Sequence, residues 1–220
     1  MPTALVIFDL DGTLIDSAPD LAAAINAMLA GYGREPLAVQ EVRRMVGDGV
    51  ALLVARALAA RDCRPAEPAE AERSFMRHYE SAATSLTTVF PGAVQALQAL
   101  SAAGIPLAVC TNKPARITSA ILGSLGLAKY FARVVAGDSL PFRKPDPRVL
   151  LALLEAFAAA RQDSLLVGDS EVDAATASGA AVPFVLMKHG YRRGAVAEIP
   201  CRAALESFAE LPALVGVPVA

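Results

Sequence analysis

Short apolar runs rich in Val, Ile and Leu recur along this chain, with helical patterns between them. They occupy residues 4–10, 105–110, 165–167 and 182–187, with a shorter one at 133–136. Such runs, without alternating polar residues, are typical of strands that are buried on both faces of a parallel sheet. Strands that alternate with helices imply right-handed crossovers between parallel neighbours. The sequence therefore predicts an α/β fold built on a parallel sheet.

The helical patterns between these runs have recognisable ends. Those at residues 114–125 and 147–160 begin with a proline, whose missing N–H does no harm in a first turn. The pattern at residues 91–103 stops before Gly104, which is a natural C-terminal cap. We therefore expect a helix in each of these segments.

The alternation breaks between Asp16 and about Thr88, where no convincing strand is visible. Ala-rich helical stretches punctuated by Gly and Pro fill this segment, at residues 21–30, 39–45, 50–60 and 69–82. We expect residues 16–88 to form an inserted helical cap domain above the loop that follows the first strand. Residues 1–15 and 89–220 would then form the core domain.

Bulk properties exclude several classes of protein. Hydrophobic residues make up 55% of the chain, so a substantial core can be buried. The formal net charge is -2, Trp is absent and aromatic residues make up 5%. Neither a basic footprint nor a base-stacking platform is expected from this composition. The sequence therefore predicts no nucleic-acid partner.

Targeting features and cysteine usage point to the cytoplasm. The first apolar run is interrupted at Asp9 and no basic segment precedes it, so no secretory signal is expected. No apolar run approaches the ~20 residues that a membrane helix needs, which predicts no membrane partner. The cysteines Cys63, Cys110 and Cys201 are far apart, and a reduced cytoplasmic setting is the simplest interpretation.

Two carboxylates follow the first apolar run, in the sequence Asp9-Leu10-Asp11-Gly12-Thr13. Open α/β sheets bind ligands beyond the carboxyl ends of their strands, which is where Asp9 lies. If the chain stays extended, Asp9 and Asp11 lie on one side of it, and two close carboxylates favour a cation. Gly12 then allows a sharp turn. The alternative is an acidic turn without function, which the strand before it disfavours.

Thr111 and Asn112 directly follow the apolar run at residues 105–110. A hydroxyl and free N–H groups at the end of a strand suit a phosphoryl oxygen. Alternatively, either residue caps the helix that begins near Pro114.

Lys144 lies in a proline-stiffened segment, between Arg143 and Pro145. An ammonium group that is held there can neutralise a phosphoryl group together with a nucleophile. Taken alone, an ordinary surface lysine is the better explanation of this residue.

Asp169 follows the apolar run at residues 165–167, again at the carboxyl end of a predicted strand. It would add an oxygen ligand for a hard cation such as Mg²⁺. Asp173 is a second candidate, but Ser170 and Asp173 also have the spacing of a capping box, so Asp173 has a purely structural alternative.

In this order, the four stretches resemble the signature of the haloacid dehalogenase superfamily of phosphatases. The matching residues are Asp9-x-Asp11-Gly12-Thr13, Thr111-Asn112, Lys144-Pro145 and Gly168-Asp169-x-x-x-Asp173. The resemblance spans nearly the whole chain, including a helical segment after the first motif. It implies a Rossmann-like, three-layer parallel-sheet core with an inserted all-helical cap domain.

The resemblance also implies a mechanism and a cofactor. Asp9 would attack phosphorus and form an aspartyl-phosphate, while Asp11 would protonate the leaving alcohol and later take a proton from water. Mg²⁺ would be held by Asp9, by the main-chain carbonyl of Asp11 and by Asp169. Asp173 would support this site or only cap its helix.

The remaining motif residues would bind the phosphoryl group. By the same resemblance, Thr111, Asn112 and Lys144 would hold the oxygens that are transferred. The cap would enclose the site and exclude bulk water.

Within the superfamily, the chain is most similar to the phosphoglycolate phosphatases. The similarity lies in residues 8–17, 44–49, 90–92 and 205–211. The resemblance implies that the substrate is 2-phosphoglycolate, which would yield glycolate and phosphate. Asp11 disfavours a dehalogenase, whose leaving group needs no proton. The absence of lysine between residues 16 and 88 disfavours phosphonate hydrolases, which use a cap lysine.

The cap offers a few candidates for reading the substrate. Gly47 and Asp48 lie in a Gly-Asp-Gly turn that we expect over the active site, although an ordinary turn between helices explains it equally well. Arg43 or Arg44 could pair with a substrate carboxylate, whereas the alternative is a solvated helix face.

Other functions stay open on the sequence alone. A phosphatase with a broad range of sugar phosphates, nucleotides or pyrophosphate is the main alternative, followed by a phosphosugar mutase similar to beta-phosphoglucomutase. A scaffold without activity is disfavoured because Asp9, Asp11, Lys144 and Asp169 are all present. The expected partner is a small phosphomonoester, and the chain would be a monomer or a homodimer.

Overall fold

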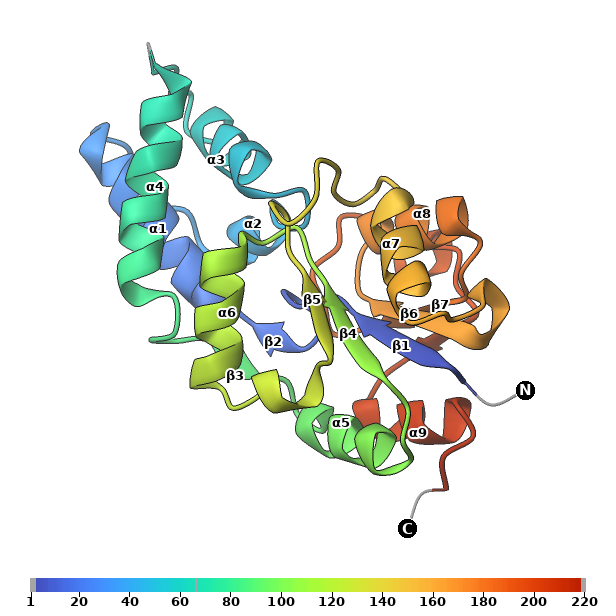
Figure 1. Cartoon of the computed structure of the whole chain (residues 1–220). Helices are drawn as coiled ribbons and strands as arrows, with labels where there is room; N and C mark the ends of the chain where they lie inside the picture. The colour runs from blue at the N-terminus through green and yellow to red at the C-terminus, as the bar shows by residue number, and fades with distance from the viewer. Residues whose placement is uncertain (1–2, 66, 219–220) are drawn as a thin grey trace.

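A six-stranded parallel sheet forms the centre of the computed structural model, which describes residues 3–65 and 67–218 (Figure 1). The strand order is β5-β4-β1-β6-β7-β8, and every neighbouring pair is parallel. The strands are β1 (Leu5–Phe8), β4 (Leu107–Cys110), β5 (Arg133–Val135), β6 (Ser164–Gly168), β7 (Phe184–Met187) and β8 (Ala203–Leu205). The predicted parallel sheet is confirmed. The edge strand β8 was not predicted, because its Ala-Ala-Leu sequence has little β character.

Successive side chains of β1 enter two different hydrophobic cores. Val6 and Phe8 pack on one face of the sheet, whereas Leu5 and Ile7 pack on the other, and all four are fully buried. Because neighbouring residues of a strand point to opposite faces, both faces of this strand need cover. This double burial explains why the run at residues 4–10 shows no polar alternation.

Helices cover both faces of the sheet and produce three layers (Figure 1). On the face of Val6 pack α5 (Ala93–Ala102), α6 (Ala115–Ser124) and the short α9 (Leu211–Leu214). On the face of Leu5 pack α7 (Arg148–Ala156) and α8 (Glu171–Ala180). Single 3-10 turns connect these elements: η1 (Ala128–Tyr130), η2 (Arg161–Asp163), η3 (Val196–Glu198) and η4 (Phe208–Glu210). The Rossmann-like core is therefore confirmed.

A helical segment separates β1 from the rest of the sheet, as predicted. It leaves the core at β2 (Ile15–Asp16) and returns at β3 (Thr88–Val89), and these two short strands pair antiparallel. Its helices are α1 (Ala18–Gly31), α2 (Val39–Arg43), α3 (Val50–Ala59) and α4 (Pro68–Ala82). The division into residues 1–15, 16–88 and 89–220 stays a prediction, whose boundaries fall within the β2–β3 pair. Residues 1–2, 66 and 219–220 of these predicted domains lie outside the described residues.

The base of the helical segment is held by a buried carboxylate, Asp20, in the first turn of α1. It accepts hydrogen bonds from the backbone N–H of Leu86 at 3.0 Å and from the N–H and hydroxyl of Thr87 at 2.8 and 2.6 Å. A buried carboxylate requires such donors. Asp20 therefore ties the start of the segment to the stretch that returns to the core.

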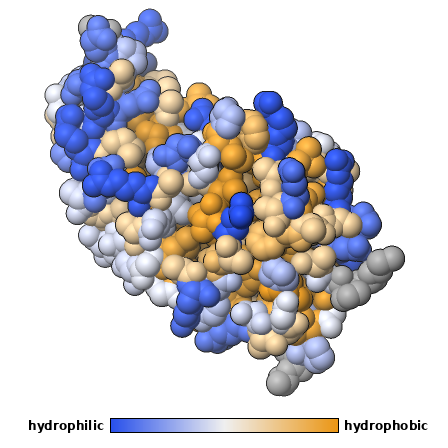
Figure 2. All heavy atoms as spheres, viewed as in Figure 1, coloured by the Kyte–Doolittle hydropathy of each residue, from blue (hydrophilic) through white to orange (hydrophobic). Residues whose placement is uncertain are grey.

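The surface differs between the helical segment and the edge of the sheet. Figure 2 shows hydrophilic residues over the outer side of α4 and a hydrophobic band across the middle of the same face, near β5. On α4, exposed Glu70 pairs with Arg73 and Arg77, whereas Val134 of β5 is 38% exposed. Within residues 3–65 and 67–218, no helix is long and apolar enough to cross a bilayer.

Candidate active site

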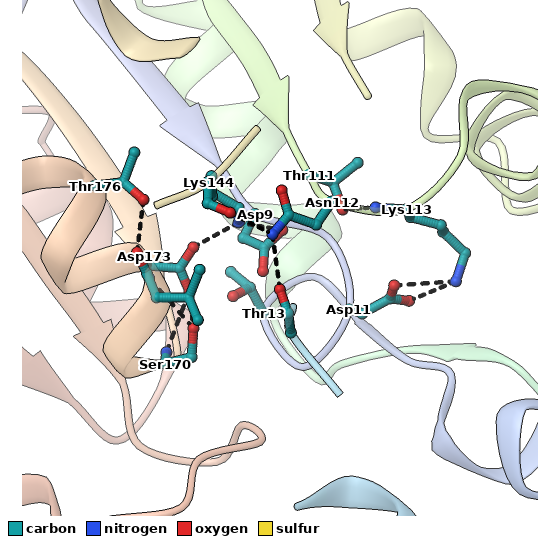
Figure 3. Close-up of polar contacts among 12 residues, drawn as sticks. Asp9, Asp11, Thr13, Thr111, Asn112, Lys113, Lys144, Ser170, Asp173 and Thr176 are labelled. Atoms are coloured by element: carbon teal, nitrogen blue, oxygen red, sulfur yellow. Dashed lines mark hydrogen bonds and ion pairs between the residues drawn. The ribbon is translucent and has the colours of Figure 1, made fainter. Parts of the chain in front are cut away.

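The carboxyl ends of three adjacent strands bring the predicted polar residues together. β1 lies between β4 and β6 in the sheet, so Asp9, Thr111 and Asp169 follow neighbouring strands at the same edge. Figure 3 shows Asp9 and Thr111 there. Asp9 and Thr111 also line a common pocket. These residues therefore lie together because each follows the carboxyl end of a strand, as expected from the sequence.

Three buried carboxylates form a cluster at this edge. Asp9, Asp169 and Asp173 each place an oxygen within 4.8 Å of the others. Burial raises the pKa of Asp9 to about 7, an effect that the charge of Asp173 reinforces and the ammonium of Lys144 opposes. Burial, together with the charges of Asp173 and Asp9, also raises the pKa of Asp169 well above its ordinary range. The cluster is therefore short of positive charge.

Lys144 supplies the positive charge that the protein places within this cluster. Its Nζ lies 2.6 Å from Asp173 Oδ1 and 2.8 Å from Asp9 Oδ1, and its side chain is buried. The contact with Asp173 is a hydrogen bond, whereas the contact with Asp9 has the distance of an ion pair without hydrogen-bond geometry. One ammonium cannot balance three carboxylates. Their hard oxygen donors therefore fit an additional divalent cation such as Mg²⁺.

Asp173 already has protein partners on both of its oxygens. Oδ1 accepts from Lys144, and Oδ2 accepts from the hydroxyl of Ser170 at 2.6 Å and from its backbone N–H at 3.2 Å. The predicted capping box between Ser170 and Asp173 is present at the start of α8. This geometry favours the helix-cap interpretation of Asp173, and direct metal binding by this residue stays a prediction.

Asp169 accepts hydrogen bonds from two loops, those of Thr13 and Tyr191. Thr13 Oγ1 donates to Oδ1 at 2.6 Å, and the backbone N–H of Tyr191 donates to Oδ2 at 2.6 Å. A Cβ atom at Gly12 would lie 2.4 Å from Asp169 Oδ2, and one at Gly190 would lie 2.1 Å from Asp169 Cβ. Both glycines thus leave the space that this carboxylate occupies.

Asp11 does not join the acidic cluster. Its Oδ1 accepts from Ser17 Oγ at 2.5 Å, and Lys113 Nζ lies 2.9 and 3.0 Å from its two oxygens. Figure 3 shows Asp11 directed toward Lys113 and away from Lys144. We expected both aspartates on one side of an extended chain, but β1 ends at Phe8 and the alternation does not continue beyond it. Asp9 and Asp11 still line the same pocket.

Asn112 joins the core to the turn of the helical segment. Its Nδ2 donates to the carbonyl of Gly47 and to that of Lys144, both at 2.9 Å. The alternative that Thr111 or Asn112 caps the next helix is wrong, because the N-cap residue of α6 is Pro114 and the first N–H of the helix, that of Ala115, donates to Asp138 Oδ1 at 2.8 Å. Thr111 Oγ1 instead accepts a hydrogen bond from the backbone N–H of Lys113 at 3.3 Å, within the loop that follows β4.

Of the cap candidates, Gly47 lies at the pocket, but the charged ones do not. Arg43 Nη2 pairs with Asp16 Oδ2 at 2.6 Å, and Arg43 and Arg44 line a separate hollow. Asp48 Oδ2 pairs with Arg56 at 2.6 Å and with Arg193, in the loop after β7, at 2.7 Å. None of these three charged residues lines the pocket of Asp9: Arg43 and Arg44 face the loop after β7, and Asp48 is engaged by two arginines.

Two polar residues that line the pocket, Lys113 and Tyr79, were not identified from the sequence. Burial would lower the pKa of Lys113, but Asp11 and Tyr79 outweigh it and raise this pKa above its ordinary value. Burial raises the pKa of Tyr79 to about 12. Lys113 follows Thr111 and Asn112 directly, so the strand-end argument could have included it. For Tyr79 on α4 the helical spacing from Phe75 signalled only packing.

Comparisons with known proteins find relatives over most of the chain. The model of the haloacid dehalogenase-like hydrolases matches residues 3–181. A phosphoglycolate phosphatase of Cereibacter sphaeroides is 46% identical over 211 residues, which cover 95% of this chain and 96% of that protein. A phosphoglycolate phosphatase of Rhodospirillum rubrum is also 46% identical, over 99% of this chain and 92% of that protein. The crystal structure of a predicted phosphoglycolate phosphatase from Haemophilus somnus has a TM-score of 0.92 at 30% identity, covering 96% and 97%.

Proposed function

We propose that this chain, which belongs to the haloacid dehalogenase-like hydrolases, is a magnesium-dependent phosphatase that transfers phosphate to Asp9. The observation that carries the proposal is the arrangement of two carboxylates with different partners at one pocket. Asp9 lies beside Lys144 in the acidic cluster, whereas Asp11 lies beside Lys113. In this proposal Asp9 acts as the nucleophile and Asp11 as the proton carrier.

In the first step, a carboxylate oxygen of Asp9 attacks phosphorus and the bond to the ester oxygen breaks. Asp11 gives its proton to that oxygen, so the leaving group departs as a neutral alcohol. Lys144 stays beside Asp9 and offsets the negative charge that meets the incoming phosphate. Thr111 and Asn112 stand at the end of β4, where they can bind phosphoryl oxygens.

In the second step, water attacks phosphorus of the aspartyl-phosphate. Asp11, now ionised, takes the proton from that water, and the bond between Asp9 and phosphorus breaks. Inorganic phosphate leaves, and both carboxylates return to their starting states. The helical segment closes one side of the pocket and limits the access of bulk water through apolar residues, namely Leu21, Val46, Val50, Leu53 and Phe75.

Asp9 and Asp169, with the main-chain carbonyl of Asp11, would hold Mg²⁺ in this proposal. Bound there, the ion would lower the charge repulsion between an anionic nucleophile and an anionic phosphate. Asp9 has a pKa of about 7 without the ion, and a neighbouring cation favours its charged, nucleophilic form.

Removal of divalent metal should therefore abolish activity. We expect treatment with EDTA to reduce phosphate release to background and added MgCl₂ to restore it, while K⁺ at equal ionic strength does not. The metal should also raise the melting temperature, because it relieves repulsion among the carboxylates of the cluster. Full activity after exhaustive chelation would contradict the metal requirement.

The substrate that the relatives favour is 2-phosphoglycolate, since both curated relatives named above are called phosphoglycolate phosphatases. The test is phosphate release with Mg²⁺ from a panel of monoesters that includes 2-phosphoglycolate, sugar phosphates, nucleotides and pyrophosphate. We expect 2-phosphoglycolate to have the highest kcat/KM. Isomerised sugar phosphate without free phosphate would instead indicate a mutase, and equal rates on all esters would indicate a broad-range phosphatase.

Lys113 does not make this pocket suitable for phosphonate cleavage. That chemistry needs a neutral lysine that forms a Schiff base. Asp11 and Tyr79 hold Lys113 in its charged form, because they raise its pKa despite its burial. The structure thus supports the hydrolysis of esters over that of phosphonates.

A further inference from the structure

Lys113 is a buried cation at the leaving-group side of the pocket. Its Nζ lies 2.9 and 3.0 Å from the oxygens of Asp11 and 2.5 Å from the hydroxyl of Tyr79. Its side chain is 3% exposed, so little of this charge is solvated. Among the described residues that line the pocket, Lys113 alone carries a positive charge.

The rest of the helical segment offers little to a charged ligand. Apart from the Tyr79 hydroxyl and the backbone of the turn at Gly47, its contribution to the pocket is apolar. An anion that enters such an environment requires a paired cation or hydrogen-bond donors. Lys113 offers the cation and Tyr79 a hydroxyl donor at the same point of the pocket. Lys113 belongs to the core, and Tyr79 belongs to α4.

The position of Asp11 sets the distance between this point and the reacting bond. In the proposed reaction, Asp11 contacts the ester oxygen, and Lys113 lies within 3.0 Å of Asp11. A group two or three bonds beyond the ester oxygen therefore comes within reach of Lys113. In an ester of a short 2-hydroxy acid, the carboxylate occupies that position.

The two buried lysines thus serve opposite ends of the substrate. Lys144 lies with Asp9 and Asp173, on the side of the nucleophile. Lys113 lies with Asp11, and Figure 3 shows the two lysines on opposite sides of Asp9. In the proposed reaction, Lys144 would then face the phosphate and Lys113 the leaving group.

We infer that Lys113, assisted by the hydroxyl of Tyr79, binds an anionic group on the leaving alcohol and selects phosphate monoesters of short hydroxy acids. The inference rests on the proposed phosphatase function. In the free protein both carboxylate oxygens of Asp11 contact the ammonium of Lys113. The carboxylate of the substrate joins or replaces Asp11 at this ammonium. The preference for a small acid then depends on Lys113, in the loop after β4, and on Tyr79 of α4, and not on Arg43 or Arg44.

The test compares two esters that differ only in this anionic group. These are 2-phosphoglycolate and 2-hydroxyethyl phosphate, in which a neutral CH₂OH replaces the carboxylate. We expect the wild-type protein to prefer 2-phosphoglycolate. Lys113→Met keeps most of the length of the side chain and removes its charge. It should lower kcat/KM for 2-phosphoglycolate by about 100-fold and that for the neutral ester by less than about 10-fold.

Matched variants separate charge recognition from general damage. Lys129→Met removes an exposed lysine outside the pocket and should change neither rate. Lys113→Arg should retain part of the preference, because it keeps the charge. Tyr79→Phe should lower only the rate on the carboxylate ester, by roughly fivefold, and it decides the question if Lys113→Met does not fold.

The outcomes distinguish this inference from the proposed function. Equal losses on both esters in Lys113→Met, or in Tyr79→Phe if only that variant folds, would overturn the role of Lys113 and leave the phosphatase intact. A wild-type protein that hydrolyses both esters equally well would also overturn it. If the wild-type protein releases phosphate from no monoester at all, the proposed function itself fails.

Discussion

Asp9→Asn should reduce phosphate release from every monoester by about 10⁴-fold or more, because it removes the oxygen anion that attacks phosphorus. Asparagine has nearly the same shape, so the packing around β1 should not change. Steady-state assays with Mg²⁺ and 2-phosphoglycolate measure the effect. Retained activity in this variant would contradict covalent catalysis by Asp9.

The same variant should not be less stable than the wild-type protein in the absence of metal. Burial raises the pKa of Asp9 from 3.8 to about 7, so the folded state favours the protonated form. Asp9 therefore stabilises the folded protein at pH values below its unfolded pKa, and this contribution is lost as the pH rises from about 4 to about 7. The asparagine side chain does not titrate, so the melting temperature of the Asp9→Asn variant should fall less over that interval. Thermal melts in EDTA across this pH range test the sign.

Lys144→Met should have the largest effect on stability of the substitutions considered, about 3–5 kcal/mol in the metal-free protein. Its ammonium lies 2.6 Å from Asp173 and 2.8 Å from Asp9, and all three side chains are buried. Without it, both carboxylates are buried without a counter-charge. Activity should also fall by about 10³-fold or more, because the phosphate then meets an unshielded anionic nucleophile. Urea unfolding and steady-state kinetics measure the two effects.

A second substitution tests whether the lost charge pairing is the cause. Asp173→Asn in the Lys144→Met background should restore part of the stability, because it removes one of the unpaired carboxylates. In the wild-type background, Asp173→Asn should destabilise the protein. Lys129→Met, on the surface, serves as the control and should leave the unfolding midpoint unchanged. A Lys144→Met protein as stable as the wild type would contradict this account.

Elements with strong local patterns were predicted well. The runs that became β1, β4, β6 and β7 are buried on both faces, so they lack any competing polar periodicity. The helix at 147–160 ends earlier, at Ala156, and Ala158 adopts a positive φ of 48° after it. β2 and β3 were missed because strands of two residues carry almost no periodic signal, and β8 was missed because its Ala-Ala-Leu sequence has little β character.

The candidate site was predictable only in part. Asp9, Thr111 and Asp169 follow buried strands, so the sheet order alone brings them to one edge. Arg43 or Arg44 was a candidate for pairing with the substrate, with a solvated helix face as the alternative, and both arginines line another hollow. Lys113 was overlooked because a lysine in a loop is usually solvated, and only α4 packing above it reveals its burial.

The sequence by itself determined the parallel sheet, the helical segment after the first strand and the order of the motif residues. These depend on local periodicity and on strand ends, which are readable without tertiary contacts. Only the tertiary structure decided that Asp9 and Asp11 have different lysine partners, Lys144 and Lys113. Side-chain direction beyond a strand end depends on packing between distant segments, and residues 11 and 113 are joined by contacts that no spacing in the chain encodes.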